Sequence, residues 1–169
     1  MANFPKVLKG FRVYIDGYDT GASANNIILP KITQRIEEIS LGSFVLPVNM
    51  GLDLLTAEIE LLEQDKNTLI QWGLLNGTTG QLITFRGYQE DNTGESNDIR
   101  IDMRGIYKEY DLGQWAKGET GKVKYIINLT QFTYTIDSVP YIVIEPLTNT
   151  FLIAGVNQLA KQKEALGIL

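Results

Sequence analysis

The sequence of 169 residues contains no cysteine and no histidine. Their absence excludes disulfides, thiolate nucleophiles, histidine general bases and nearly all zinc chemistry. The sequence also lacks the run of about 18 apolar residues that a membrane helix requires, and its first residues lack the apolar stretch of a signal peptide. We therefore expect a soluble protein, made and assembled in a cytoplasm, that holds no metal and no cofactor.

Positive charge is scarce as well. The formal net charge is -5 and the sequence pI is about 4.8, which argues against a basic surface that holds nucleic acid. Apolar residues make up 44% of the chain and charged residues 21%, as in ordinary globular proteins. The length fits one domain, so residues 1–169 are predicted to fold as a single unit.

The clearest structural signal is a predicted β-hairpin. Residues 81–89 and 98–108 each have the composition of a strand, and residues 90–97 between them favour a turn or an exposed loop. The second strand alternates between apolar and polar residues, as a half-buried strand does. Its apolar positions are Ile99, Ile101 and Met103, and its polar positions are Arg100, Asp102 and Arg104.

Similar patterns predict further strands and two helices. The strands are expected at residues 6–16, 26–31, 54–63, 122–137 and 139–147. One short helix is expected from Asp65 to Trp72, ending at Gly73, and a second, packed on the sheet, between Gly155 and Gly167. Together they predict a mainly β fold, an antiparallel β-sandwich or half-barrel with one or two short α-helices.

One long strand changes phase near Thr130. Before this residue the apolar side chains of the predicted 122–137 strand occupy odd positions, and after it they occupy even positions. A shift of one residue moves every later side chain to the opposite face. The pattern therefore predicts either a β-bulge near Thr130 or a strand that crosses there from one sheet to another.

Residues 32–53 are unusually apolar for a segment rich in glycine, serine and proline. Two interpretations are open: a hairpin within the core, or an arm at about residues 36–53 that projects and is buried against a neighbouring subunit. An exposed arm of this composition would be costly in water, so it would need a partner. The residues expected to make that contact are Leu41, Gly42, Phe44, Val45, Leu46, Val48 and Met50.

Three local motifs have an ordinary explanation. Asp19-Thr20-Gly21 matches the aspartic-protease triplet, but it occurs once and its neighbours indicate a turn. Residues 118–121 lack the glycine spacing of a phosphate-binding loop, and Val123 follows Lys122 where that loop has a hydroxyl residue. Trp72, Trp115 and the eight tyrosines suggest a small-ligand or carbohydrate-binding module as an alternative function, although core and interface aromatics explain them better. We expect no enzyme activity.

The order of several short motifs resembles the major tail tube proteins of contractile-tailed phages and phage-tail-like bacteriocins. The resemblance runs from about Val7 to the C-terminus. Its motifs are Leu29-Pro30-Lys31-Ile32-Thr33, Gly51-Leu52-Asp53, Arg86-Gly87-Tyr88-Gln89, Asp91-Asn92-Thr93-Gly94-Glu95, Arg104-Gly105, Lys108-Glu109, Asp111-Leu112-Gly113 and Gly155-Val156-Asn157-Gln158-Leu159. The segment from Ser40 to Pro47 departs from the family pattern, being shorter and more apolar.

The resemblance implies a structural subunit. In that family, strands of six β-sandwich subunits close an inner β-barrel, and the hexameric rings stack into a hollow tube. The implied partners are other copies of the chain, the tail sheath, baseplate and tail terminator proteins, a tape-measure protein and DNA in passage without specific binding. A secreted tube or spike protein of a related injection machine is a further alternative. We expect an acidic lumen that repels DNA, with Arg100, Asp102 and Arg104 as one candidate row facing it.

Overall fold

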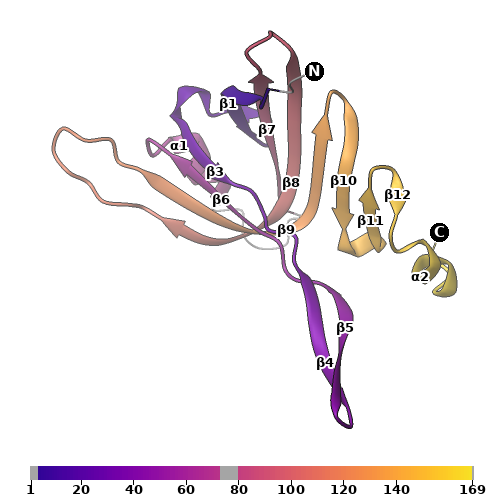
Figure 1. Ribbon diagram of the computed structural model, residues 1–169. Coiled ribbons are helices and arrows are strands. Elements are labelled where there is room, and N and C mark those ends of the chain that lie inside the picture. The colour runs from indigo at the N-terminus through magenta and orange to yellow at the C-terminus, as the bar shows by residue number, and fades with distance from the viewer. Residues whose placement is uncertain (1–3, 73–79, 169) are drawn as a thin grey trace.

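The computed structural model describes residues 4–72 and 80–168, and all of its strands except β4 and β5 belong to one antiparallel sheet (Figure 1). Along its main path the strand order is β12-β11-β10-β9-β8-β7-β1-β2, with β6 and β3 branching from β9. The strands of this sheet are β1 (Val7–Ile15), β2 (Tyr18–Asp19), β3 (Ala24–Ile28), β6 (Thr56–Leu61), β7 (Gln81–Glu90), β8 (Ser96–Asp111), β9 (Val123–Ile136), β10 (Val139–Glu145), β11 (Thr150–Ile153) and β12 (Val156–Asn157).

The predicted central hairpin is present as β7 and β8. Its antiparallel register runs from Gln81 opposite Gly105 to Glu90 opposite Ser96, so the connecting loop comprises residues 91–95. The loop is shorter than the predicted 90–97 because the strands continue to pair through their polar ends. The other predicted strands are also present, with modest differences at their ends.

The phase change in β9 is a β-bulge. On β8, Arg104 and Gly105 are neighbours, but they lie opposite Gln131 and Leu129, which leaves Thr130 as the extra residue. Before the bulge β9 pairs with β6, and after it β9 pairs with β10. The bulge therefore accounts for the phase change. It marks the point where β9 passes from one layer of the fold to the other, and both layers belong to the same sheet.

The core lies between these two layers. Its buried side chains come from alternate positions of β1, β7, β8 and β10 on one side and of β6 and the first half of β9 on the other. Alternation follows from strand geometry, since successive side chains point to opposite faces. The buried residues include Val13, Ile83, Phe85, Ile101, Met103, Ala57, Ile59, Leu61, Tyr125, Ile127 and Ile144.

The two α-helices are short. α1 (Lys66–Trp72) begins directly after Asp65, whose carbonyl oxygen accepts a hydrogen bond from the Leu69 N–H at 3.1 Å. This agrees with the predicted start, while the predicted end at Gly73 lies outside the described residues. Neither described helix is long and apolar enough to cross a membrane.

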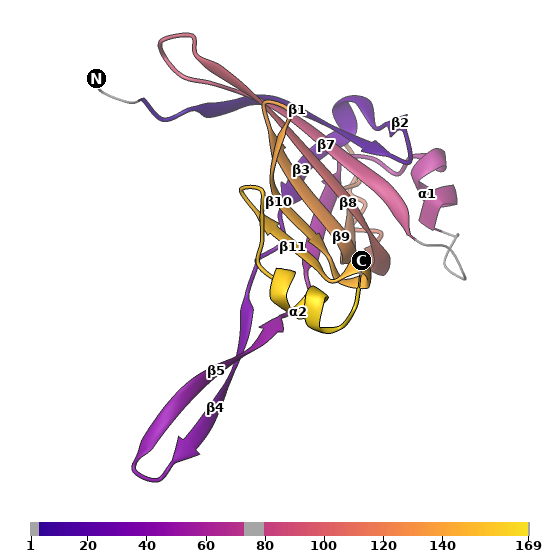
Figure 2. The ribbon, with the colours of Figure 1, turned by 90° about the vertical axis from the view of Figure 1, so that its right-hand side faces the viewer.

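The prediction for the C-terminal helix was partly wrong. α2 covers only Ala160–Ala165, and Val156–Asn157 instead pairs with β11 as strand β12. The Asn157 side chain explains the difference, because its Oδ1 accepts hydrogen bonds from the N–H of Leu159 at 3.0 Å and of Phe151 at 3.5 Å. No residue of α2 is buried, so the helix does not pack on the sheet as expected, and Figure 2 shows it at the end of the sheet. Gly167, with φ of 66°, follows it as predicted.

Candidate assembly surfaces

A two-stranded hairpin stands apart from the sheet and projects from the body of the molecule (Figures 1 and 2). It consists of β4 (Gln34–Leu41) and β5 (Phe44–Leu52), which pair from Gln34 opposite Leu52 to Leu41 opposite Phe44. We call residues 34–52 the arm. Its bounds differ slightly from the predicted 36–53.

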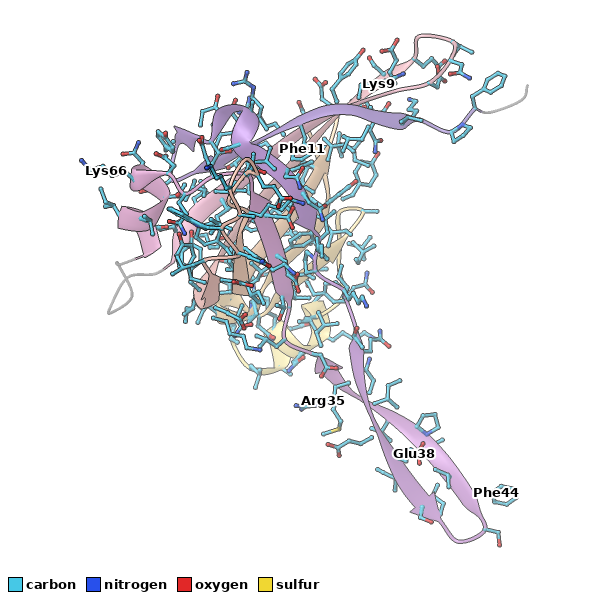
Figure 3. All side chains as sticks on the ribbon, turned by 90° about the vertical axis from the view of Figure 1, so that its left-hand side faces the viewer. Lys9, Phe11, Arg35, Glu38, Phe44 and Lys66 are labelled. Atoms are coloured by element: carbon cyan, nitrogen blue, oxygen red, sulfur yellow. The ribbon has the colours of Figure 1, made fainter. Side chains whose placement is uncertain are left out.

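The arm is apolar and exposed. Every residue of β4 is exposed, and in β5 only Val48 and Leu52 are partly buried. Phe44 lies at the tip, as Figure 3 shows, and 78% of its surface is accessible. The arm does not contribute a buried residue to the core, so the interpretation as a core hairpin does not describe this structure. A projection of this kind favours contact with another molecule, because exposed apolar groups gain by burial.

The structure places all seven predicted contact residues on the arm. Gly42 is in its two-residue turn with φ of 66°, a conformation that glycine adopts without steric cost. Val48 is partly buried and the other six are exposed. They are Leu41, Gly42, Phe44, Val45, Leu46 and Met50.

A second surface lies on the outer side of the sheet, opposite the core. In β1, β7, β8 and the second half of β9 the residues that alternate with core positions point away from the core. We call this surface the polar face. It carries an open depression of about 850 Å³ whose lining includes Arg12, Tyr14, Arg86, Arg100 and Asp102.

The three predicted lumen-facing residues share this face. Arg100 is exposed, and its Nε lies 2.9 Å from Asp102 Oδ2. Asp102 Oδ1 also accepts a hydrogen bond from the Thr84 hydroxyl at 2.7 Å. Arg104 is partly buried next to the bulge, where its carbonyl oxygen accepts a hydrogen bond from the Thr130 hydroxyl at 3.4 Å.

Sequence reasoning missed two arginines on the same face. Arg86 lies directly opposite Arg100 on β7, and Arg12 lies directly opposite Arg86 on β1. Alternation within β7 could have placed Arg86 on this face, because Arg86 lies at an alternate position with Thr84 and Tyr88. Arg12 had no such signal, since its position depends on how β1 pairs with β7.

The Asp-Thr-Gly triplet forms a turn at the edge of the polar face. Asp19 Oδ1 accepts a hydrogen bond from the Gly21 N–H at 2.8 Å, and Asp19 Oδ2 lies 2.5 Å from Arg12 Nη1. The Gly21 hydrogen bond, followed by Arg12, holds the pKa of Asp19 below its usual value. A carboxylate that stays ionised does not share a proton, so the geometry opposes the protease interpretation.

The β7–β8 loop is organised by one carboxylate. Asp91 Oδ1 accepts hydrogen bonds from the Thr93 hydroxyl and the Thr93 N–H, both at 2.7 Å, and from the Glu95 N–H at 3.0 Å. The Thr93 hydroxyl, then the two backbone N–H groups and Lys6, lower the pKa of Asp91. The carboxylate thereby substitutes for strand pairing where the hairpin turns.

Asp91→Ala is expected to lower the melting temperature at pH 7, because three donors of the loop lose their acceptor. A carboxyl whose pKa is depressed on folding stabilises the protein above its unfolded pKa, here about 3.8, and loses that effect as pH falls through the folded pKa. The difference in melting temperature between Asp91→Ala and wild type should therefore narrow below about pH 4. Calorimetry between pH 2.5 and 7 measures this difference. Asp53→Ala, which removes an exposed carboxylate with the same charge, is the control. Equal effects of the two variants would contradict the assignment.

The tryptophans that suggested a ligand-binding module are only partly described. Trp115 lies in the loop between β8 and β9 with 76% of its surface exposed, and the side chain of Trp72 lies outside the description. Among the residues that the structure describes, no group of three carboxylates is placed to hold a metal ion.

Comparison with known proteins identifies the family. Residues 5–167 match the family model described as phage tail tube protein FII. The chain is 29% identical to the tail tube protein of Escherichia phage P2, over 97% of this chain and 98% of that protein. It is 25% identical to the major tail tube protein of Serratia phage KSP20, over 90% of each.

A solved structure shares the fold. It is a chain of the sheath-tube complex of an extracellular contractile injection system, PVC, in its extended state. The TM-score is 0.58 at 11% sequence identity, and the match covers 78% of this chain and 91% of the other. The sequence match over nearly the whole length and the shared fold agree. The chain therefore belongs to the phage tail tube protein FII family and is a structural subunit of the tail tube.

Proposed function

We propose that six copies of this chain close into a ring, and that rings stack into the hollow inner tube of a contractile particle. The observation that carries the proposal is the arm, whose exposed apolar side chains have no partner in the core of their own chain. In the stacked tube the arm packs against a neighbouring subunit, so that its apolar surface leaves water only on assembly.

Open sheet edges support ring closure. The side of β1 away from β7 pairs with β2 only at Tyr14 and Ile15, so no described strand covers it between residues 7 and 12. At the other end of the sheet, β12 pairs only with β11 among the described strands. Edges of this kind find partners when copies join side by side, and a barrel of strands removes the edges altogether.

The polar face is the part of the sheet that we assign to the lumen. The apolar faces of the two layers meet in the core, so the outward faces of the two layers lie on opposite sides of the subunit. In a ring closed through the β1 and β12 edges, the polar face lies toward the axis and the outward side of β6 away from it. Arg100, Asp102 and Arg104 then line the channel.

The remaining proposals, on partners, activity and location, follow if the protein forms a hollow conduit. The tube lies inside the tail sheath and ends at baseplate and tail terminator proteins, while a tape-measure protein and then DNA occupy its channel. Such a subunit needs no catalytic activity and no small-molecule substrate. It is assembled in the bacterial cytoplasm and becomes part of a virion tail or a headless tail-like particle.

Electron microscopy of the purified protein tests the assembly, with stacked rings as the expected result. Because the sequence has no cysteine, single cysteines then report the orientation of the subunit. Thr135 is on the polar face opposite Arg100, and Glu60 is on the outward side of β6. In assembled tubes, Thr135→Cys should react with a small maleimide and resist a bulky polymer maleimide, because the channel excludes the polymer.

The matched control is Glu60→Cys, which should react with both reagents in tubes that carry no sheath. Both variants should react with both reagents as unassembled subunits, which shows that the cysteines are intrinsically reactive. Polymer labelling of Thr135→Cys in tubes together with protection of Glu60→Cys would reverse the assigned orientation. A protein that stays monomeric at every concentration and salt tried would contradict the tube itself.

A further inference from the structure

Three arginines form a straight row across the polar face. Arg12 on β1 lies opposite Arg86 on β7, and Arg86 lies opposite Arg100 on β8. Adjacent strands are about 4.8 Å apart, so these are directly opposed side chains of like charge. Such pairs destabilise a sheet. The row is therefore costly to the isolated subunit, and it stands out in a chain whose net charge is -5.

The charge of the row is only partly neutralised within the subunit. Asp19 pairs with Arg12 and Asp102 pairs with Arg100, at 2.5 and 2.9 Å. In the described residues Arg86 has no carboxylate partner, and its guanidinium lies 5.9 Å from the centre of the Tyr14 ring. The middle of the row consequently keeps a positive charge above an aromatic ring.

The row is also accessible. The side chains of Arg12 and Arg100 are 59% and 50% exposed. All three arginines line the open depression of the polar face, together with Tyr14, Tyr88 and the carboxylates of Asp98 and Asp102. A ligand that approaches the polar face therefore meets three guanidinium groups at the spacing of neighbouring strands.

We propose that the Arg12–Arg86–Arg100 row binds phosphate groups of nucleic acid that passes through the channel. The inference rests on the proposed placement of the polar face at the lumen. Guanidinium groups present paired N–H donors that match phosphate oxygens, and contacts to phosphates carry no sequence preference. The charge of the row is thus complementary to a polyanion, and it replaces the uniformly repelling lumen that the acidic composition suggested.

The internal carboxylates keep this contact weak. A phosphate that approaches Arg12 or Arg100 competes with Asp19 or Asp102, so it gains a contact at the cost of an existing ion pair. Exchange between internal and external partners lets the phosphate leave easily. A row built in this way guides a moving polyanion along the channel and does not retain it.

Fluorescence anisotropy with a short labelled DNA duplex tests the proposal on unassembled subunits at low salt. Arg86→Gln should weaken binding roughly fivefold and reduce the slope of log K against log salt concentration by about 1, because one phosphate contact is lost. The triple variant Arg12→Gln, Arg86→Gln and Arg100→Gln should abolish measurable binding. Thermal melting confirms that each variant is folded.

Charge-matched controls separate the row from net charge. Lys66, Lys117 and Lys161 are exposed residues away from the polar face, and their single and triple replacements by Gln change the net charge equally. These controls should bind the duplex like wild type at matched salt. Equal losses in row and control variants, or no binding by wild type at low salt, would overturn the proposal.

Two further outcomes distinguish this proposal from the tube model. If Arg86→Gln binds the duplex normally and fails to form tubes, the row serves contacts between copies and the phosphate assignment is wrong. If Arg86→Gln loses duplex binding while polymer labelling places Thr135→Cys outside the tube, the phosphate site stands and the lumen assignment fails.

Discussion

Deletion of residues 41–47 is expected to abolish tube formation while leaving the subunit folded. The deleted residues are the tip of the arm, and none of them belongs to the core. Burying one large apolar side chain contributes about 1.5–3 kcal/mol, and each subunit would lose several such contacts with its neighbours. Electron microscopy and sedimentation should show only unassembled subunits, and circular dichroism should show the β-sheet spectrum of wild type.

A milder variant protects this test against misfolding of the shortened hairpin. Phe44→Ser combined with Leu46→Ser keeps the length and register of the arm and removes most of its apolar surface at the tip. This variant should also fail to form tubes. Leu46→Met, which keeps an apolar side chain of similar volume, is the control and should assemble. If Phe44→Ser combined with Leu46→Ser unfolds the subunit, the arm serves its own core, and if that variant still forms tubes, the assembly role is wrong.

The strands and the bulge were predictable because their signals are local. Alternation in residues 98–108 and 122–137 reports one buried face directly, and the shift near Thr130 reports the bulge without knowledge of the partner strand. The prediction of the C-terminal helix was partly wrong for a reason that is also local but does not concern apolar spacing. The Asn157 side chain accepts backbone hydrogen bonds that hold the chain beside β11, and apolar spacing does not record this competition.

The candidate surfaces also include features that local sequence predicts and features that depend on strand pairing. The composition of residues 32–53 left a core hairpin and a projecting arm both open, and the family resemblance contributed to the preference for the arm. The alternation of β8 placed Arg100, Asp102 and Arg104 on one face. The arginine row was not recognisable, because Arg12 joins it only through the pairing of β1 with β7, whose register shifts between Leu8 and Gly10. Contacts between segments distant in sequence depend on such registers, and a single sequence does not contain them.

Gly105 lies where β8 closely approaches the bulged strand, and this close approach requires a residue without a side chain. A Cβ at this position would fall 2.3 Å from the carbonyl oxygen of Asn128, and 2.9 Å from both the carbonyl carbon of Asn128 and Cγ2 of Ile127. The nearest atoms are backbone, so no rotation of a side chain relieves the contact. Any larger residue must separate β8 from β9 where β9 passes between the two layers.

Gly105→Ala is therefore expected to destabilise the subunit by roughly 3 kcal/mol, the cost of overpacking against a rigid backbone. For a chain of this length, each kcal/mol corresponds to about 2–4 °C, so the melting temperature should fall by roughly 6–12 °C. Gly10→Ala is the matched control, because a Cβ there meets nothing within 4 Å. Calorimetry of the two variants measures the difference. Equal melting temperatures would mean that β8 and β9 separate at little cost, and the bulge would then be a flexible joint between the layers.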